Sequence, residues 1–125
     1  MELEDSELRR VRDGQTLHTL ASGMEISRRV KHEPIREMER LSPEELERKT
    51  NKENGSKFLP HITLRHIVEM TARVLDENGA TPQRDATYHK AFKKPIGISK
   101  GRDVRGLLVV CSGRYAHAFP IDETS

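Results

Sequence analysis

Several residue types are scarce in this chain of 125 residues, and each scarcity excludes a class of protein. Tryptophan is absent and only 4% of the residues are aromatic, so the hydrophobic core must be small and mostly aliphatic. The single cysteine, Cys111, rules out an internal disulfide. Because Cys111 lies in an apolar run, we expect a buried, reduced thiol and a cytoplasmic protein.

Long hydrophobic runs are missing as well. No run approaches the roughly 18 residues of a membrane span, and the acidic start of the chain lacks the apolar centre of a signal peptide. We therefore expect a soluble protein that does not contact a membrane. The length allows one domain, which we place at residues 14–125, after a charged arm or short helix at residues 1–13.

Positive charge is concentrated in one part of the chain, although the net charge is only +2. Between residues 84 and 114 there are eight lysines or arginines against two acids. Such a local excess is typical of a surface that contacts RNA or another polyanion. The cations that we expect to make this contact are Lys93, Lys94, Lys100, Arg102 and Arg114.

The segment from residue 61 to 79 has the clearest secondary-structure pattern. Its apolar residues recur on one helical stripe and its charged residues on the opposite one, as in an amphipathic helix. Asn78 and Gly79 then predict a left-handed stop. His66 falls on the polar side, so its imidazole should face solvent. The apolar stripe consists of Leu64, Ile67, Val68, Val74 and Leu75.

The first half of the chain predicts smaller elements. Residues 15–20 and 24–30 alternate polar and apolar side chains around a turn at 21–23, which indicates a β-hairpin or two loosely packed extended segments. Residues 34–40 and 43–50 predict two short charged helices. Residues 51–57 are typical of a flexible polar loop.

The last third predicts strands. Residues 85–94 fit either a helical turn or a strand, residues 95–98 a short extended piece and residues 100–103 a basic turn. The apolar run 104–111 predicts a buried strand, and residues 114–121 should return beside it after a tight turn. Tyr115, His117 and Phe119 share one face of that last strand. The chain therefore predicts a small single α+β domain, with a central amphipathic helix packed on an antiparallel sheet that ends in a C-terminal β-hairpin.

Metal and cofactor motifs are not found. His61 and His66 are five residues apart, which is not one face of a helix, and the only thiol is expected to be buried. The glycines form neither a phosphate-binding loop nor a nucleophile elbow. We expect no metal and no cofactor.

Residues 61–64 match the His-x-Thr-hydrophobic element of the two-histidine phosphoesterases. That resemblance would make His61 and Thr63 phosphate ligands. The family carries a second element of the same kind, whereas here the threonine of His18-Thr19-Leu20 comes one place early.

Two histidines and the basic stretch between them suggest RNA chemistry. Cleavage of RNA needs a general base, a general acid and cations that stabilise charge on phosphorus. Imidazoles can hold opposite protonation states near neutral pH, so His66 and His117 are our candidates for acid and base. Tyr115 and Phe119 would stack on bases, and no metal is required.

The same residues resemble the RNase A-like toxin domains of bacterial contact-dependent inhibition systems. The resemblance covers about residues 61–121 and rests on Arg65-His66-Ile67 and on His117-Ala118-Phe119-Pro120. It implies a toxin with ribonuclease activity and an immunity protein as partner. The chain departs from the family in the shorter interval between these motifs, and in His117 and Phe119, which replace the usual Thr and Tyr.

A non-enzymatic binding module is the alternative from another class. A small, charged chain with a weak core is also typical of a phage or mobile-element inhibitor, or of an accessory subunit. Such a protein would dock on a host protein or nucleic acid through an edge strand or a basic loop.

Overall fold

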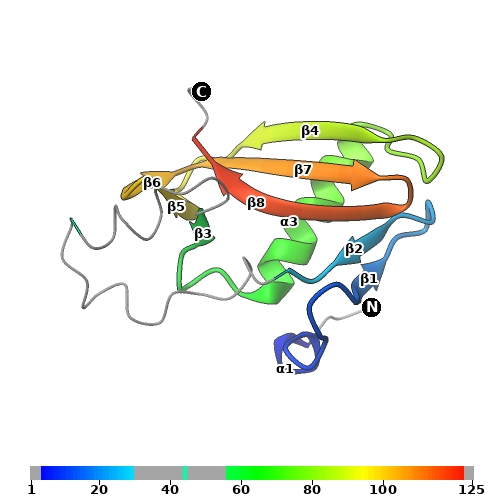
Figure 1. Cartoon of the computed structure of the whole chain (residues 1–125), viewed down its shortest axis with the longest axis horizontal. Coiled ribbons are helices and arrows are strands. Elements are labelled where there is room, and N and C mark those ends of the chain that lie inside the picture. The colour runs from blue at the N-terminus through cyan, green and yellow to red at the C-terminus, as the bar shows by residue number, and fades with distance from the viewer. Residues whose placement is uncertain (1–3, 30–43, 45–55, 123–125) are drawn as a thin grey trace.

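Five strands form the main sheet of the computed structural model, which describes residues 4–29, 44 and 56–122. One helix, α3 (Leu64–Glu77), crosses one face of this sheet (Figure 1). The small single α+β domain that the sequence predicts is therefore confirmed. In spatial order the strands are β1 (Thr16–Thr19), β2 (Glu25–Ser27), β8 (Tyr115–Ile121), β7 (Gly106–Ser112) and β4 (Ala86–Ala91).

The sheet is antiparallel except at one pair. β1 pairs with β2, and β7 with β8 and β4, in antiparallel fashion, whereas β2 and β8 run parallel. The prediction of an antiparallel sheet is wrong at this pair. A hairpin turn cannot join parallel neighbours, and here the long connection between β2 and β8 contains α3.

A second, three-stranded sheet packs against the end of β8. It consists of β3 (Lys57–Phe58), β5 (Gly97–Ser99) and β6 (Arg102–Val104). A Cβ atom on Gly97 would lie 2.3 Å from Cβ of Pro120, so only glycine allows this close approach. The basic turn predicted at residues 100–103 is confirmed at Lys100 and Gly101, whose φ angles are 54° and 75°, whereas Arg102 and Asp103 already belong to β6.

Capping determines where α3 begins and ends. The Thr63 hydroxyl accepts a hydrogen bond from the His66 backbone N–H at 3.1 Å, so the helix starts at Leu64, later than the pattern suggests. Gly79 has a φ angle of 61°, which confirms the left-handed stop.

The short helix α1 (Asp5–Leu8) is tied to α3 and to β2. The Asp5 carboxylate accepts a hydrogen bond from the Leu64 N–H at 2.8 Å, at the start of α3. The buried Arg28 guanidinium donates to the carbonyls of Leu8, Arg9 and Val11 at 2.8 to 3.2 Å. In the described part of the expected arm or short helix, residues 4–13, only Asp5–Leu8 is helical.

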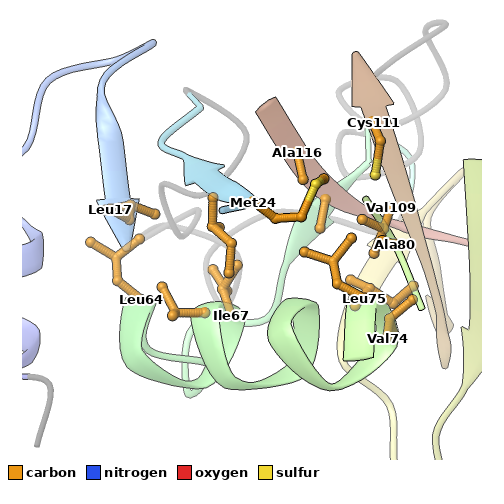
Figure 2. Packing of buried hydrophobic residues seen from close by; sticks show 14 of the residues in the cluster. Leu17, Met24, Leu64, Ile67, Val74, Leu75, Ala80, Val109, Cys111 and Ala116 are labelled. Carbon is orange, nitrogen blue, oxygen red and sulfur yellow. The ribbon is translucent and has the colours of Figure 1, made fainter. Parts of the chain in front are cut away.

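The apolar stripe of α3 forms the core, as predicted. All five predicted stripe residues are buried in one cluster with residues of the sheet. Figure 2 shows Leu64, Ile67 and Leu75 on the side of α3 that faces the strands. Thr71 is buried among them because its hydroxyl donates to the Ile67 carbonyl at 2.7 Å. The sheet contributes Leu17, Met24, Ile26, Leu107, Val109, Cys111, Ala116 and Ala118 to the same cluster.

Among the described residues, α3 covers one face of the sheet, so the strand predicted to be buried is buried on that face and half-buried on the other. The run 104–111 divides between β6 and β7, and within β7 the buried Leu107 and Val109 alternate with half-buried Leu108 and Val110. Successive side chains of a strand point to opposite faces, so Leu108 and Val110 lie on the face away from α3. Cys111 is buried as predicted, and burial raises the pKa of its thiol.

β1, β2 and β4 correspond to predicted elements. The first hairpin is confirmed as β1 and β2, and the ambiguous stretch at 85–94 is a strand because Ala86 to Ala91 pair along β7. The predicted helices at 34–40 and 43–50 and the loop up to residue 55 lie outside the described residues, apart from residue 44.

Replacing Ile67 by alanine should strongly destabilise the domain. Ile67 is 0% exposed, and truncating such a side chain typically costs about 2–5 kcal/mol through lost burial and a cavity. Urea unfolding at equilibrium measures the change. Asp76→Ala, at an exposed position of the same helix, should change stability by less than about 0.5 kcal/mol. Equal effects of the two substitutions would contradict the assignment of the core stripe.

The stability that Asp5 provides should depend on pH. Burial alone would raise its pKa, but hydrogen bonds from the Arg9 side chain and from backbone N–H groups of α3 hold the pKa below its ordinary value of 3.8. A carboxyl with a lowered folded-state pKa stabilises the fold above its unfolded pKa, and this contribution is lost as pH falls through the folded pKa. Asp5→Ala should therefore cost about 1 kcal/mol near pH ~6 and progressively less as the pH falls below ~4, measured by urea unfolding. A pH-independent difference would contradict this role.

Candidate nucleic-acid interface

Aromatic and apolar side chains line the sheet face opposite α3, which we call the open face. Strand register places Phe119 beside Leu108, and His117 beside Val110, in adjacent rows. Tyr115 follows on the same face of β8 because positions 115, 117 and 119 alternate with the buried 116, 118 and 120. The predicted sharing of one face by these three rings is therefore confirmed.

The three rings follow one another along β8. Tyr115 is 50% exposed. Among the described residues, no other large hydrophobic side chain is exposed to this degree. The rings of His117 and Phe119 stack with centroids 6.2 Å apart and an angle of 25° between planes. Alternate residues of a strand are about 7 Å apart, so the rings form a row of π surfaces.

Arg114 brings positive charge to the end of this row. Its guanidinium carbon lies 5.9 Å from the centroid of the Tyr115 ring, a cation–π distance. One guanidinium nitrogen is 4.0 Å from a carboxylate oxygen of Glu25, an ion pair at the limit of contact. The Arg114 side chain is 61% exposed, so it can also reach a phosphate.

A polar hollow of about 730 Å³ continues the open face beyond Tyr115. Hydroxyl, amide and guanidinium groups line it, and Glu25 is held there by a hydrogen bond from the Thr16 hydroxyl at 3.1 Å. These groups can donate and accept hydrogen bonds next to the Tyr115 ring. The lining residues are Val11, Gly14, Gln15, Thr16, Glu25, Ser27, Arg29, Ser112 and Tyr115.

His66, Lys93 and Lys94 lie on the other side of the sheet. They line a groove of about 760 Å³ between α3 and the segment after β4, which we call the helix-side groove. Its floor is apolar and its rim is cationic. Its lining consists of His61, Ile62, His66, Arg73, Lys90, Ala91, Phe92, Lys93, Lys94, Pro95 and Ile96.

Glu77 lies beside the helix-side groove, because two residues of the groove lining bind its carboxylate. Glu77 accepts hydrogen bonds from Lys90 at 2.7 Å and from Arg73 at 3.0 Å. The bonds from Lys90 and Arg73 lower the pKa of the Glu77 carboxyl. Arg73 and Lys90 are thereby paired with an acid, so Lys93 and Lys94 supply the positive charge elsewhere on the rim.

The structure does not bring the two candidate catalytic histidines together. His66 is exposed on the flank of α3, and His117 lies on the open face, so the sheet stands between them. A base and an acid must both reach one phosphodiester, and these two cannot. The sequence correctly predicted that His66 faces solvent on its helix and that His117 shares a strand face with Tyr115 and Phe119. It did not predict that the two histidines lie on opposite sides of the sheet, because helix and strand patterns do not tell which sheet face a helix covers.

The other predicted contact residues are spread over the molecule. Arg114, Tyr115 and Phe119 belong to the open face, while Lys93 and Lys94 belong to the helix-side groove. Lys100 and Arg102 lie at the turn between β5 and β6. Since the sheet of β5 packs on the far end of β8, this turn lies about 20 Å from Tyr115, the length of that strand.

Sequence reasoning missed the residues of the polar hollow. Gln15, Thr16 and Ser27 come from the first hairpin, which adjoins β8 only through the parallel pairing of β2. The alternation of polar and apolar residues in β1 and β2 is visible in the sequence, but it does not indicate that β2 pairs with β8. Thr63 of the phosphoesterase-like element has a structural role, because its hydroxyl caps the N-terminus of α3.

Comparison with known proteins adds no family. No family model, curated protein or solved structure matches this chain. Within residues 4–29 and 56–122, no three His, Cys, Asp or Glu side chains gather as a metal site would require. None of the helices in that part of the chain combines the length and hydropathy needed to span a bilayer.

Proposed function

We propose that this chain is an RNA-binding module that holds single-stranded RNA on the open face. The observation that carries the proposal is the row of Tyr115, His117 and Phe119 on the face of β8 opposite α3, with Arg114 at its end. Sequence-tolerant binding of single strands combines base stacking on aromatic rings with cations that contact the backbone. The open face offers both.

The polar hollow favours RNA as the ligand. It adjoins Tyr115, so a nucleotide stacked on that ring would place its sugar or its base edge among the groups of Gln15, Thr16 and Ser27. These groups can both donate to and accept from a 2′-hydroxyl, which DNA lacks. Double-stranded RNA would not fit this scheme because its bases are not available for stacking.

Binding without cleavage follows from the position of the histidines. A two-histidine mechanism needs an acid and a base around one phosphate, and His66 and His117 are on opposite sides of the sheet. His117 acts instead as a stacking surface next to Phe119. The toxin-like ribonuclease that the sequence suggests is replaced here by a non-enzymatic RNA contact.

Replacing Tyr115 by alanine should weaken RNA binding. Loss of one stacked base typically costs about 1–3 kcal/mol, or between about fivefold and a hundredfold in Kd. Fluorescence anisotropy with a labelled oligouridine of about twelve nucleotides measures the change. Tyr115→Phe should retain most of the affinity, and Arg114→Ala should reduce the slope of log Kd against log salt by about one.

The control for these variants is Arg65→Ala, which removes an exposed cation from α3 on the other side of the sheet. It should leave the affinity within about twofold of the unaltered protein. Equal losses for Arg65→Ala and Arg114→Ala, full affinity in Tyr115→Ala, or a preference for double-stranded RNA would contradict the proposal.

RNA should remain intact in the presence of the protein. Total RNA incubated with the purified chain, with and without chelator, is expected to keep its length on a denaturing gel, because the candidate acid and base, His66 and His117, lie on opposite sides of the sheet. The variants His66→Ala and His117→Ala should behave identically. Chelator-resistant breakdown that both substitutions abolish would overturn this expectation.

A further inference from the structure

We propose that the helix-side groove and the edge of β4 together bind an acidic, extended peptide segment of a partner protein. This site is separate from the open face and does not depend on the proposed RNA binding. Three features of the groove fit such a ligand: the apolar floor, the uneven distribution of charge around the rim and the strand edge beside it.

The floor would take apolar side chains. Ile62, Phe92 and Pro95 are half-buried and line the groove together with the buried Ile96. A groove of about 760 Å³ has room for more than one side chain. Because Lys90 and Ala91, the last two residues of β4, also line the groove, a ligand on this floor lies beside the end of β4.

The rim selects negative charge. Lys93, Lys94, His61 and His66 are exposed around the groove, and Glu77, the acid beside it, is already engaged by Lys90 and Arg73. Lys93 and Lys94 form no ion pair with an acid among the described residues. Carboxylates of an acidic ligand would complement them, which also speeds association.

The edge of β4 would bind the peptide backbone. β4 is the last strand of the five-stranded sheet (Figure 1), and in the described part of the chain it pairs only with β7. The Phe92 N–H donates to the Arg105 carbonyl at 2.9 Å, so the alternation of a strand directs the amides of Thr87, His89 and Ala91 away from β7. These groups can pair with an added strand.

Strand addition also explains why the groove and the edge act together. Every second side chain of a strand added beside β4 would point to the α3 side of the sheet, where the groove opens. An extended peptide with apolar residues alternating with acids would therefore fill the floor and meet the cations of the rim. A compact ligand could occupy the floor but would not use the edge.

The test uses a fluorescein-labelled peptide of sequence acetyl-Glu-Leu-Asp-Val-Asp-Leu-Glu-amide and the full chain, with binding followed by fluorescence anisotropy. Lys93→Glu combined with Lys94→Glu should weaken binding at least about tenfold. The matched control, Lys100→Glu with Arg102→Glu, makes the same change of charge at the turn between β5 and β6, outside the groove lining, and should have less than about a threefold effect. Far-UV circular dichroism and thermal unfolding establish that each variant is folded.

Two further arms test the strand edge. Ala91→Pro removes an amide that points away from β7, so it should weaken binding while the pairing of β4 with β7 persists. A peptide methylated on alternate backbone nitrogens should lose affinity in one of the two possible registers. Tyr115→Ala should bind the peptide normally, which separates this site from RNA binding.

Three outcomes would overturn the proposal. The first is equal loss of binding in the Lys93/Lys94 and Lys100/Arg102 variants, which would indicate a non-specific charge effect. The second is full affinity in Ala91→Pro together with competition by decanoate, which would indicate a small amphiphile in the groove. The third is oligouridine binding that depends on Lys93 and Lys94 while the peptide does not bind, which would make the groove a nucleic-acid site.

Discussion

The burial of one stripe of α3 against one face of the five-stranded sheet is the interaction on which the rest of this structure depends. Ile67, Val68 and Val74 are almost completely buried against it, and no second helix in the described residues covers the other face. A sheet with one covered face has an apolar side and a solvated side. The position of α3 therefore determines which side chains each side of the sheet offers to a ligand.

The two sides of the sheet differ in their chemistry. The open face carries aromatic rings in a row with an arginine and a polar hollow, which suits flat bases and hydroxyl groups. The helix-side groove has an apolar floor and a cationic rim, which suits alternating apolar and acidic side chains. Both sites attract negative charge, but they would recognise different shapes. A small domain could thus hold RNA and a protein segment at once.

Positive charge alone would not have separated these sites. The eight cations between residues 84 and 114 look like one cluster in the sequence. In the structure Lys90 is paired with Glu77, Lys93 and Lys94 rim the groove, and Arg114 lies over Tyr115. The cluster disperses because successive strands run in opposite directions and their turns fall at opposite ends of the sheet.

The sequence by itself determined the local elements: the amphipathic period of α3, its stop at Gly79, the closing hairpin and the shared face of Tyr115, His117 and Phe119. These follow from side-chain periodicity and turn chemistry, which act over a few residues. Only the tertiary structure decided that α3 covers the face opposite those rings, and that β2 lies parallel to β8. The physical reason is that a strand such as β7, apolar on both faces, can be covered from either side. Packing over the whole chain makes that choice, and with it the separation of His66 from His117.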